Sequence, residues 1–313
     1  MSVSRDLPHV ITNGGVGDVD ALLDLYAASR EELEAELLVH GAILFRGFGI
    51  RTREMLERAV KEIGGEALDY VDGNSPRRKL GGGVYTSTEY PPEFFISLHN
   101  ELSYSNRWPA RLFFCCATAP RSGGETPLAD SRAILARLPD DVREAFVRKK
   151  VKYIRNLHGG RGFGPSWQET FETDDRSAVE EWCRVTETDY RWNDDGSLTV
   201  TQIRPAAATH PRTGEWVWFN QADQFHPSTH PREIYESMLA LYEGREHLIP
   251  QTAYFGDDTP IDVAMLDAVR RTVAEEMRLF PWQEGDLLMV DNMLVCHGRR
   301  PFEPPRTILV SMT

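Results

Sequence analysis

The feature of this sequence that most constrains its fold is a series of short strand-like runs that do not alternate regularly with helices. The runs are rich in β-branched and aromatic residues and are bounded by Gly, Pro or Asn, which is typical of β-strands. They cover residues 42–45, 94–98, 111–118, 151–154, 198–203, 216–219, 286–290 and 307–312. A doubly wound sheet would need strict strand–helix alternation. That alternation is absent, as are a dinucleotide-binding GxGxxG unit and a P-loop.

A few helical patterns lie between these runs. The clearest covers residues 261–279, where apolar residues from Ile261 to Met277 recur at every fourth position. Thr259 is its predicted N-cap and Pro260 its first helical residue. Weaker patterns cover residues 53–63, 141–150 and 231–242. We therefore predict a mainly β protein with inserted helices, a jelly roll, folded as a single domain over residues 1–313.

Segments rich in Gly and Pro predict loops. Residues 72–92 are expected to form one long loop, which contains Gly81-Gly82-Gly83. A second glycine-rich segment covers residues 159–162. Both glycine-rich segments are expected to be mobile and to cover a binding site.

The charge of the chain excludes several classes of function. The formal net charge is −13, from 35 Lys and Arg against 48 Asp and Glu. A broad nucleic-acid surface needs clustered basic residues, and an anionic membrane attracts them, so both partners are disfavoured. The N-terminus has no apolar signal core and no apolar run is long enough to cross a bilayer, which predicts a cytoplasmic protein. The oligomeric state is not readable from the chain.

The four cysteines predict buried free thiols. No two of them have CxxC spacing, and the neighbours Cys115 and Cys116 should point to opposite faces of a strand. A structural zinc site or a disulfide framework is therefore not expected.

The residues that carry chemistry are His99, Glu101 and His297. His99 and Glu101 are two positions apart, so an extended strand would direct both side chains to the same side. Two histidines and one carboxylate form the facial triad of non-heme Fe(II) oxygenases, which leaves coordination positions open for a 2-oxo acid and O2. His226 and His230 have helical spacing, but Pro227 lies between them, which disfavours a helical zinc site.

Several further motifs follow one another along the chain. They are His99-Asn100-Glu101, Arg107-Trp108-Pro109, Gly123-Gly124-Glu125-Thr126-Pro127, Asp130-Ser131-Arg132, Asp291-Asn292, His297-Gly298-Arg299 and Pro305-Arg306. In this order they resemble the TauD/TfdA (taurine dioxygenase) superfamily, and most of all its branch near clavaminate synthase and the syringomycin-biosynthesis hydroxylase. The resemblance runs from about Gly41 to the C-terminus. It implies a double-stranded β-helix (jelly roll) fold and a reaction that uses Fe(II), 2-oxoglutarate and O2.

Carried over residue by residue, the resemblance implies that His99, Glu101 and His297 bind iron. It implies that Arg306 holds the distal carboxylate of 2-oxoglutarate, a task suited to a planar guanidinium that can bond bidentately. It also implies that the Thr126 hydroxyl assists that carboxylate.

The chain departs from the family pattern at two places. Glu101 stands where many relatives carry Asp, although the clavaminate-like branch also uses Glu. Arg306 follows His297 by nine residues, a shorter spacing than in the taurine enzyme, so Arg299 and Arg300 stay open as alternatives. Strand parity favours Arg306, because it shares a face with the apolar residues at 308, 310 and 312.

The branch resemblance implies an amino acid or amino-acid-derived substrate, free or bound to a peptidyl-carrier protein, in natural-product biosynthesis. The expected reaction oxidises an unactivated C–H bond, normally by hydroxylation, and releases succinate and CO2. An acidic carrier could dock on Arg77-Arg78-Lys79, which could equally be a solvated loop. Candidate substrate contacts are polar residues beside the ligands or after the 216–219 run: Asn100, Arg107, Asn220, Gln221 and Arg299.

Two other classes of function remain open. The first is a non-catalytic protein that binds 2-oxoglutarate or another small molecule on the same scaffold, which the intact triad disfavours. The second is a zinc-dependent hydrolase with the same three ligands. The pairing of Thr126 with Arg306 disfavours the hydrolase, because that pair serves an oxo-acid cosubstrate.

Overall fold

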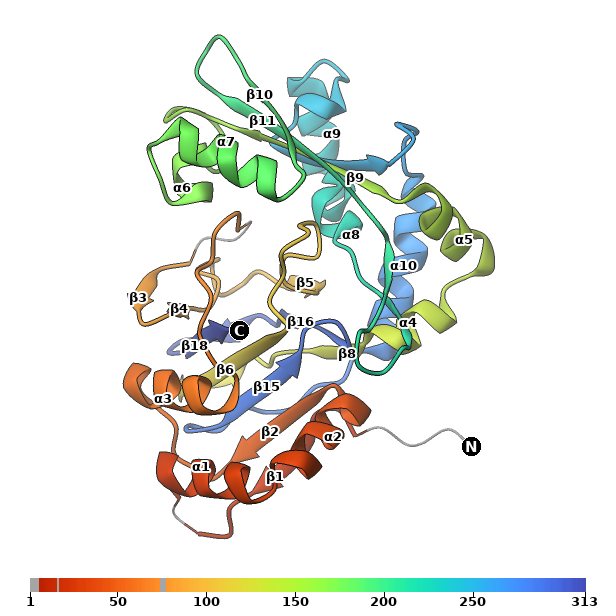
Figure 1. Cartoon of the computed structure of the whole chain (residues 1–313). Helices are drawn as coiled ribbons and strands as arrows, with labels where there is room; N and C mark the ends of the chain where they lie inside the picture. Colours follow the sequence, from red (N-terminus) through yellow and green to blue (C-terminus); the bar gives the residue numbers. More distant parts are fainter. Residues whose placement is uncertain (1–5, 16, 74–76) are drawn as a thin grey trace.

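The computed structural model describes residues 6–15, 17–73 and 77–313 (Figure 1). Its largest sheet has seven strands, of which β1 and β2 pair in parallel and the other neighbours are antiparallel. In sheet order these strands are β1 (His9–Thr12), β2 (Ala42–Arg46), β15 (Leu287–Asp291), β6 (Arg111–Thr118), β18 (Thr307–Met312), β4 (Val84–Thr86) and β3 (Lys79–Gly81).

A three-stranded antiparallel sheet packs against one face of this large sheet. It consists of β5 (Ile96–His99), β16 (Val295–Arg299) and β8 (Leu128–Asp130). One apolar cluster joins the two sheets: Phe114, Leu288 and Ile308 come from the large sheet, and Leu128 and Val295 come from the small one. The two sheets form the predicted jelly roll, with inserted helices around it.

Three helices cover the opposite face of the large sheet: α1 (Val19–Ala28), α2 (Arg30–His40) and α3 (Arg53–Ile63). The strands alternate between the two faces, since Ile43 and Phe45 pack under these helices while Leu44 packs in the jelly-roll interior. Cys115 and Cys116 of β6 also point to opposite faces, as predicted: Cys115 packs under the helices and Cys116 packs in the jelly-roll interior. All four cysteines are buried and free.

A four-stranded antiparallel sheet lies at the other end of the molecule from α1 (Figure 1). Its order is β10 (Asp189–Trp192), β11 (Leu198–Arg204), β9 (Val151–Leu157) and β14 (Gln251–Phe255). Two short pairs are β12 (Ala207–Thr209) with β13 (Trp216–Trp218), and β7 (Ser122–Gly123) with β17 (Phe302–Glu303). The remaining helices are α4 (Ser131–Arg137), α5 (Asp140–Lys149), α6 (Trp167–Phe171), α7 (Arg176–Val185), α8 (Ala222–Phe225), α9 (Arg232–Leu241) and α10 (Val263–Glu276), with 3-10 turns at Pro227–Thr229 and Glu246–Leu248. In the described ranges, no helix is both long and apolar enough to cross a membrane.

Two local predictions are wrong. The helix expected over 261–279 is α10, and its N-cap is Asp262, whose carboxylate accepts a hydrogen bond from the Ala264 amide at 2.9 Å. Residues 72–92 are not one loop, because β3 and β4 form a hairpin within them. The glycines 81–83 make its turn with positive φ angles of 102°, 59° and 70°, which glycine adopts readily. They therefore turn the edge of the large sheet instead of covering a site.

Candidate active site

The three predicted metal ligands come together on the small sheet. His99 ends β5 and lies opposite His297 of β16 in the strand register, and the two ring centroids are 4.5 Å apart. Glu101 Oε2 is 3.9 Å from His297 Nε2, and one potential ligand atom of each of the three residues lies within 4.8 Å of the others. All three side chains are buried. Two imidazoles and one carboxylate that converge in this way fit Fe(II) and leave positions open for other ligands.

Glu101 reaches the site from a turn and not from the strand, because β5 already ends at His99. Asn292 fixes this turn: its side-chain oxygen accepts a hydrogen bond from the Glu101 amide at 2.7 Å, and its amide group donates to the carbonyls of Glu101 and Pro109, both at 2.9 Å. Sequence reasoning quoted Asn292 only as part of a motif. Its role needs a partner 191 positions away, which no local pattern shows.

The hydrogen bonding and charge of the three ligands suit metal binding. His99 Nδ1 lies 2.9 Å from the Ser97 carbonyl oxygen and 3.0 Å from the Gln224 side-chain amide nitrogen. In the tautomer that donates from Nδ1 to the Ser97 carbonyl, Nε2 is left for a metal. Burial lowers the pKa of His99 and lowers that of His297 well below its ordinary value. Burial by itself would raise the pKa of Glu101, but the Arg77 guanidinium and His99 outweigh it and the net pKa is lowered. Neutral imidazoles and an ionised carboxylate are the forms that bind a cation.

Arg77 is a site residue that sequence reasoning missed. Its Nη2 donates to Glu101 Oε2 at 2.5 Å, its guanidinium lies over the Tyr70 ring at 4.4 Å, and its side chain is 3% exposed. Among the described residues, its Nε and Nη1 have no hydrogen-bond partner. The interpretation of Arg77-Arg78-Lys79 as a docking patch is therefore wrong for Arg77, which is buried beside a metal ligand.

Arg306 and Thr126 line the same small cavity as His99 and His297. Arg306 Nε donates to the Gly124 carbonyl at 2.9 Å, and Thr126 Oγ1 accepts from the Trp282 indole N–H at 3.2 Å. Burial, together with the nearby charge of Arg299, lowers the pKa of Arg306 to about 10, so it stays cationic near neutral pH. Arg306 has no ion-pair partner within the part of the chain that the structure describes. It is thus available for a carboxylate.

The space at these residues is small. The cavity measures about 30 Å³, and Arg77 lines it together with the histidines. A single water already needs about 10–15 Å³ measured in this way. A five-carbon dicarboxylate therefore binds only after side chains move. Arg77 is the obvious candidate, because a metal ion at Glu101 would replace its charge.

The residues predicted to contact substrate have structural partners. Asn100 donates to the Asn292 carbonyl at 2.6 Å, Asn220 to the Ala206 carbonyl at 2.8 Å, and Gln221 to the Asn100 carbonyl at 2.6 Å. These three line a cavity of about 120 Å³ that also touches His99. Their role in substrate binding stays a prediction.

The two predicted arginines differ from each other. Arg107 is exposed, with its guanidinium 5.7 Å from the centre of the Trp182 ring. Arg299 is buried and donates to the backbone carbonyls of Thr88, Tyr90, Pro91 and Phe94 at 2.7–3.2 Å. Because its Nη1 and Nη2 donate to these carbonyls, Arg299 anchors the loop before β5. A contact between Arg299 and substrate stays a prediction.

Comparison with known proteins agrees with this geometry. The family model of the taurine catabolism dioxygenase TauD, TfdA family, matches residues 4–313. The chain is 35% identical over 293 residues to the dapdiamide synthesis protein DdaC of Enterobacter agglomerans, covering 94% of this chain and 88% of that protein. It is 33% identical over 294 residues to a clavaminate synthase-like protein of Arabidopsis thaliana, covering 90% of this chain and 84% of that one.

The fold is also that of a solved structure. PvcB of Pseudomonas aeruginosa, described as an Fe, α-ketoglutarate-dependent oxygenase from an isonitrile synthetic pathway, superposes with a TM-score of 0.54 at 16% identity. The match covers 98% of this chain and 86% of PvcB. The family match over nearly the whole chain, with the two relatives above 30% identity, establishes that this protein belongs to the TauD/TfdA family of Fe(II)- and 2-oxoglutarate-dependent dioxygenases.

Proposed function

We propose that this dioxygenase oxidises an unactivated C–H bond, normally by hydroxylation, of a free amino acid or amino-acid derivative in natural-product biosynthesis. The observation that carries the proposal is one buried cavity lined by His99, His297, Thr126 and Arg306, with Glu101 beside it. Iron and 2-oxoglutarate, when bound, would supply the means to activate O2, with one oxygen atom going to the substrate and the other to succinate as 2-oxoglutarate loses CO2. We expect the chain to act as one domain in the cytoplasm.

The chain's own residues have separate tasks in this proposal. His99, Glu101 and His297 hold the metal from one side, which leaves the remaining positions open. Arg306 pairs with the distal carboxylate of 2-oxoglutarate, and Thr126 adds a hydrogen bond to it. The burial of these groups strengthens both interactions, since a charge pair is stronger where little water screens it.

A larger cavity next to the site supports an amino acid as substrate. It measures about 510 Å³, and Arg77 lines both this cavity and the small one, so the two are adjacent. Arg77 offers a buried cation to a substrate carboxylate, while Glu89, Glu169 and Glu172 make the other walls negative. Each of these glutamates already has a partner, namely Arg78 at 3.7 Å, Ser166 at 2.7 Å and Lys79 at 3.6 Å, so an amine would share them. A molecule that carries both groups therefore matches the charges of the cavity.

The relatives support a biosynthetic setting. DdaC is named for dapdiamide synthesis and PvcB for an isonitrile pathway. A free substrate is favoured over one on a carrier protein, because Arg77 is buried and Lys79 is paired with Asp69 at 2.7 Å. Arg78 is exposed and pairs with Glu89 at 3.7 Å.

The test starts from the anaerobic protein with Fe(II) and 2-oxoglutarate. We expect a weak charge-transfer band near ~500 nm, typical of 2-oxo-acid chelation at an open facial site. Arg306→Gln should raise the Kd of 2-oxoglutarate by about 100-fold, which corresponds to two charged hydrogen bonds of about 1.5 kcal/mol each. Arg300→Gln is the matched control, because Arg300 is exposed one residue beyond β16. A band that persists unchanged in Arg306→Gln would contradict the assignment of Arg306.

The substrate class is tested by succinate release over a panel of amino acids, their carboxamides and aminoacyl carrier proteins. We expect a free amino acid to be turned over and its carboxamide to be poor. In Arg77→Gln the KM for the acid should rise far more than that for the amide. Turnover of carrier-bound groups alone would refute the free-substrate proposal. Binding of Fe(II) and 2-oxoglutarate with no succinate from any compound would favour the non-catalytic binding protein.

A further inference from the structure

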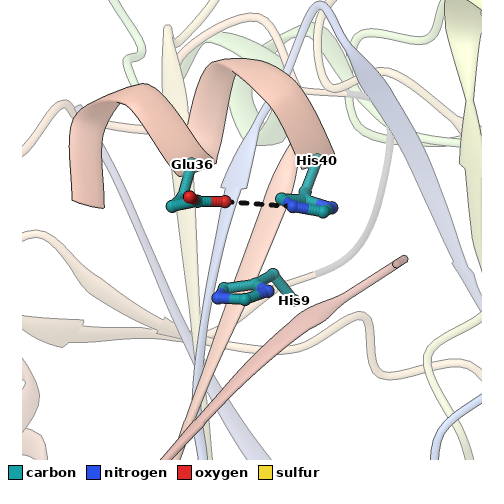
Figure 2. A group of neighbouring side chains, drawn as sticks. All are labelled: His9, Glu36 and His40. Atoms are coloured by element: carbon teal, nitrogen blue, oxygen red, sulfur yellow. Dashed lines mark ion pairs between the residues drawn. The ribbon is translucent and has the colours of Figure 1, made fainter. Parts of the chain in front are cut away.

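A second group of metal-type ligands, separate from the active-site triad, lies on β1 and α2 (Figure 2). His9 begins the edge strand β1, and Glu36 and His40 stand one turn apart on α2. His40 Nε2 is 3.0 Å from Glu36 Oε2, and the His9 ring is stacked on the His40 ring with centroids 4.7 Å apart. Potential ligand atoms of all three residues lie within 4.8 Å of one another.

The contact between His40 and Glu36 needs a cation. His40 Nδ1 lies 2.9 Å from the Asp6 backbone carbonyl, an acceptor, so Nδ1 must carry a proton. A neutral imidazole has only one N–H. Its Nε2 is then a lone pair that faces the Glu36 carboxylate, and two acceptors 3.0 Å apart repel each other. Either a metal ion lies between them or the ring carries a second proton.

Three features suit a metal ion at this position. A ring nitrogen bonded to a backbone carbonyl is the usual arrangement of a metal-binding histidine. His40 is the last residue of α2, where the negative end of the helix dipole attracts a cation. Around a tetrahedral zinc ion, ligand atoms at about 2.1 Å lie about 3.4 Å apart, only slightly more than the spacing seen here.

His9 is close enough to become a third ligand, because its ring nitrogen lies within 4.8 Å of the potential ligand atoms of Glu36 and His40. The two ring planes are 18° apart, so their nitrogen lone pairs run nearly parallel and do not converge. Metal binding therefore requires His9 to turn about its Cβ–Cγ bond, a rotation with a broad energy profile.

We propose that His9, Glu36 and His40 form a second divalent-metal site that can take zinc, with water as the fourth ligand. Two imidazoles and one carboxylate are nitrogen and oxygen ligands that zinc accepts. The ion links the edge strand β1 to α2. The site is independent of the oxygenase reaction, so its test does not depend on turnover.

The experiment is a Zn²⁺ titration of full-length protein that lacks the active-site ligands through His99→Ala and His297→Ala. One zinc per chain is expected in this background. Adding His40→Gln should weaken zinc binding by more than about 100-fold, since even loss of an outer partner of a ligand costs about 10- to 100-fold. Adding His247→Gln, which changes an exposed histidine outside both groups, should leave the affinity unchanged.

Three further measurements keep the test decisive if His40→Gln folds poorly. Glu36→Gln keeps the helix and should also weaken zinc binding, and X-ray absorption of the zinc complex should show two imidazole ligands. Zinc should raise the Tm of the background protein and not that of the Glu36→Gln variant. No zinc in the background protein, or equal zinc in both variants, would overturn the site and leave a proton between His40 and Glu36.

Discussion

The pKa of Glu34 allows the effect of replacing this residue on the free energy of unfolding to be calculated. It lies on α2 and joins three parts of the chain: Tyr26 on α1 donates to its carboxylate at 2.6 Å, Arg111 on β6 at 2.6 Å, and Arg212 at 2.7 Å. Its side chain is 17% exposed. Burial would raise the pKa of Glu34, but the hydrogen bonds from Tyr26, Arg212 and Arg111 outweigh it and lower the pKa from 4.5 to about 2.

This shift sets both the size and the pH range of the effect. A difference of about 2.5 pKa units at about 1.36 kcal/mol each corresponds to about 3 kcal/mol of folding free energy. Because the folded-state pKa is the lower one, this stability is present above pH 4.5 and is lost as the pH falls towards 2. By pH 3 about 2 kcal/mol of it should already be lost.

The assay is urea unfolding of wild type and Glu34→Gln between pH 7 and pH 3. We expect the variant to be less stable by about 3 kcal/mol at pH 7 and by only about 1 kcal/mol at pH 3, since its amide does not titrate. Glu32→Gln is the matched control, an exposed glutamate on the same helix. A difference between wild type and Glu34→Gln that stays constant over this pH range would refute the linkage argument.

Three further changes test the geometry of the site. Asn292→Ala removes the fully buried side chain that fixes the Glu101 turn, so we expect a loss of about 3 kcal/mol in urea unfolding and at least a tenfold weaker Fe(II) titration. Unchanged Fe(II) affinity would show that the turn does not position the ligand. Arg299→Gln frees the carbonyls of residues 88–94, so hydrogen exchange there should accelerate while Fe(II) still binds. A higher KM for 2-oxoglutarate with unchanged exchange would instead make Arg299 a cosubstrate ligand. Gly298→Ala would place a Cβ 2.4 Å from the Ile96 carbonyl oxygen, so β16 must shift and Fe(II) affinity should fall, whereas Gly14→Ala, with nothing within 4 Å, should have no effect. Equal Fe(II) affinity in both glycine variants would contradict the close approach of β16 to β5.

The pattern of short runs predicted the jelly roll well, because strand periodicity and breakers are local properties. The helix over 53–63 and the strand over 111–118 have the predicted bounds. The helices α1, α2, α4, α6, α7 and α8 were not predicted. In α7 only Val179 and Cys183 are buried, so the apolar stripe was too narrow to stand out from the polar residues around it. Tertiary packing stabilises such helices more than their own pattern does.

The sequence alone predicted the residues of the candidate site. His99, Glu101, His297, Thr126 and Arg306 lie in family motifs, and the structure brings them to one cavity or its edge. Strand parity predicted that Arg306 shares a face with Ile308 and Val310. Arg306 lies one residue before β18, whose register shifts between Thr307 and Ile308, but all three residues line the same cavity. These inferences hold because a ligand motif and a strand face each depend on residues only a few positions apart.

Only the tertiary structure decided what surrounds the ligands. Arg77 seemed part of a surface patch until the fold buried it against Glu101, and Asn292 had no visible role until the fold set it beside the same turn. Likewise, β1 and α2 bring His9 to Glu36 and His40. Each of these contacts joins segments whose proximity depends on the sheet order, and the energy of a buried charge depends on everything packed around it. A local sequence pattern reveals neither the order of the strands in the sheet nor the energy of a buried charge.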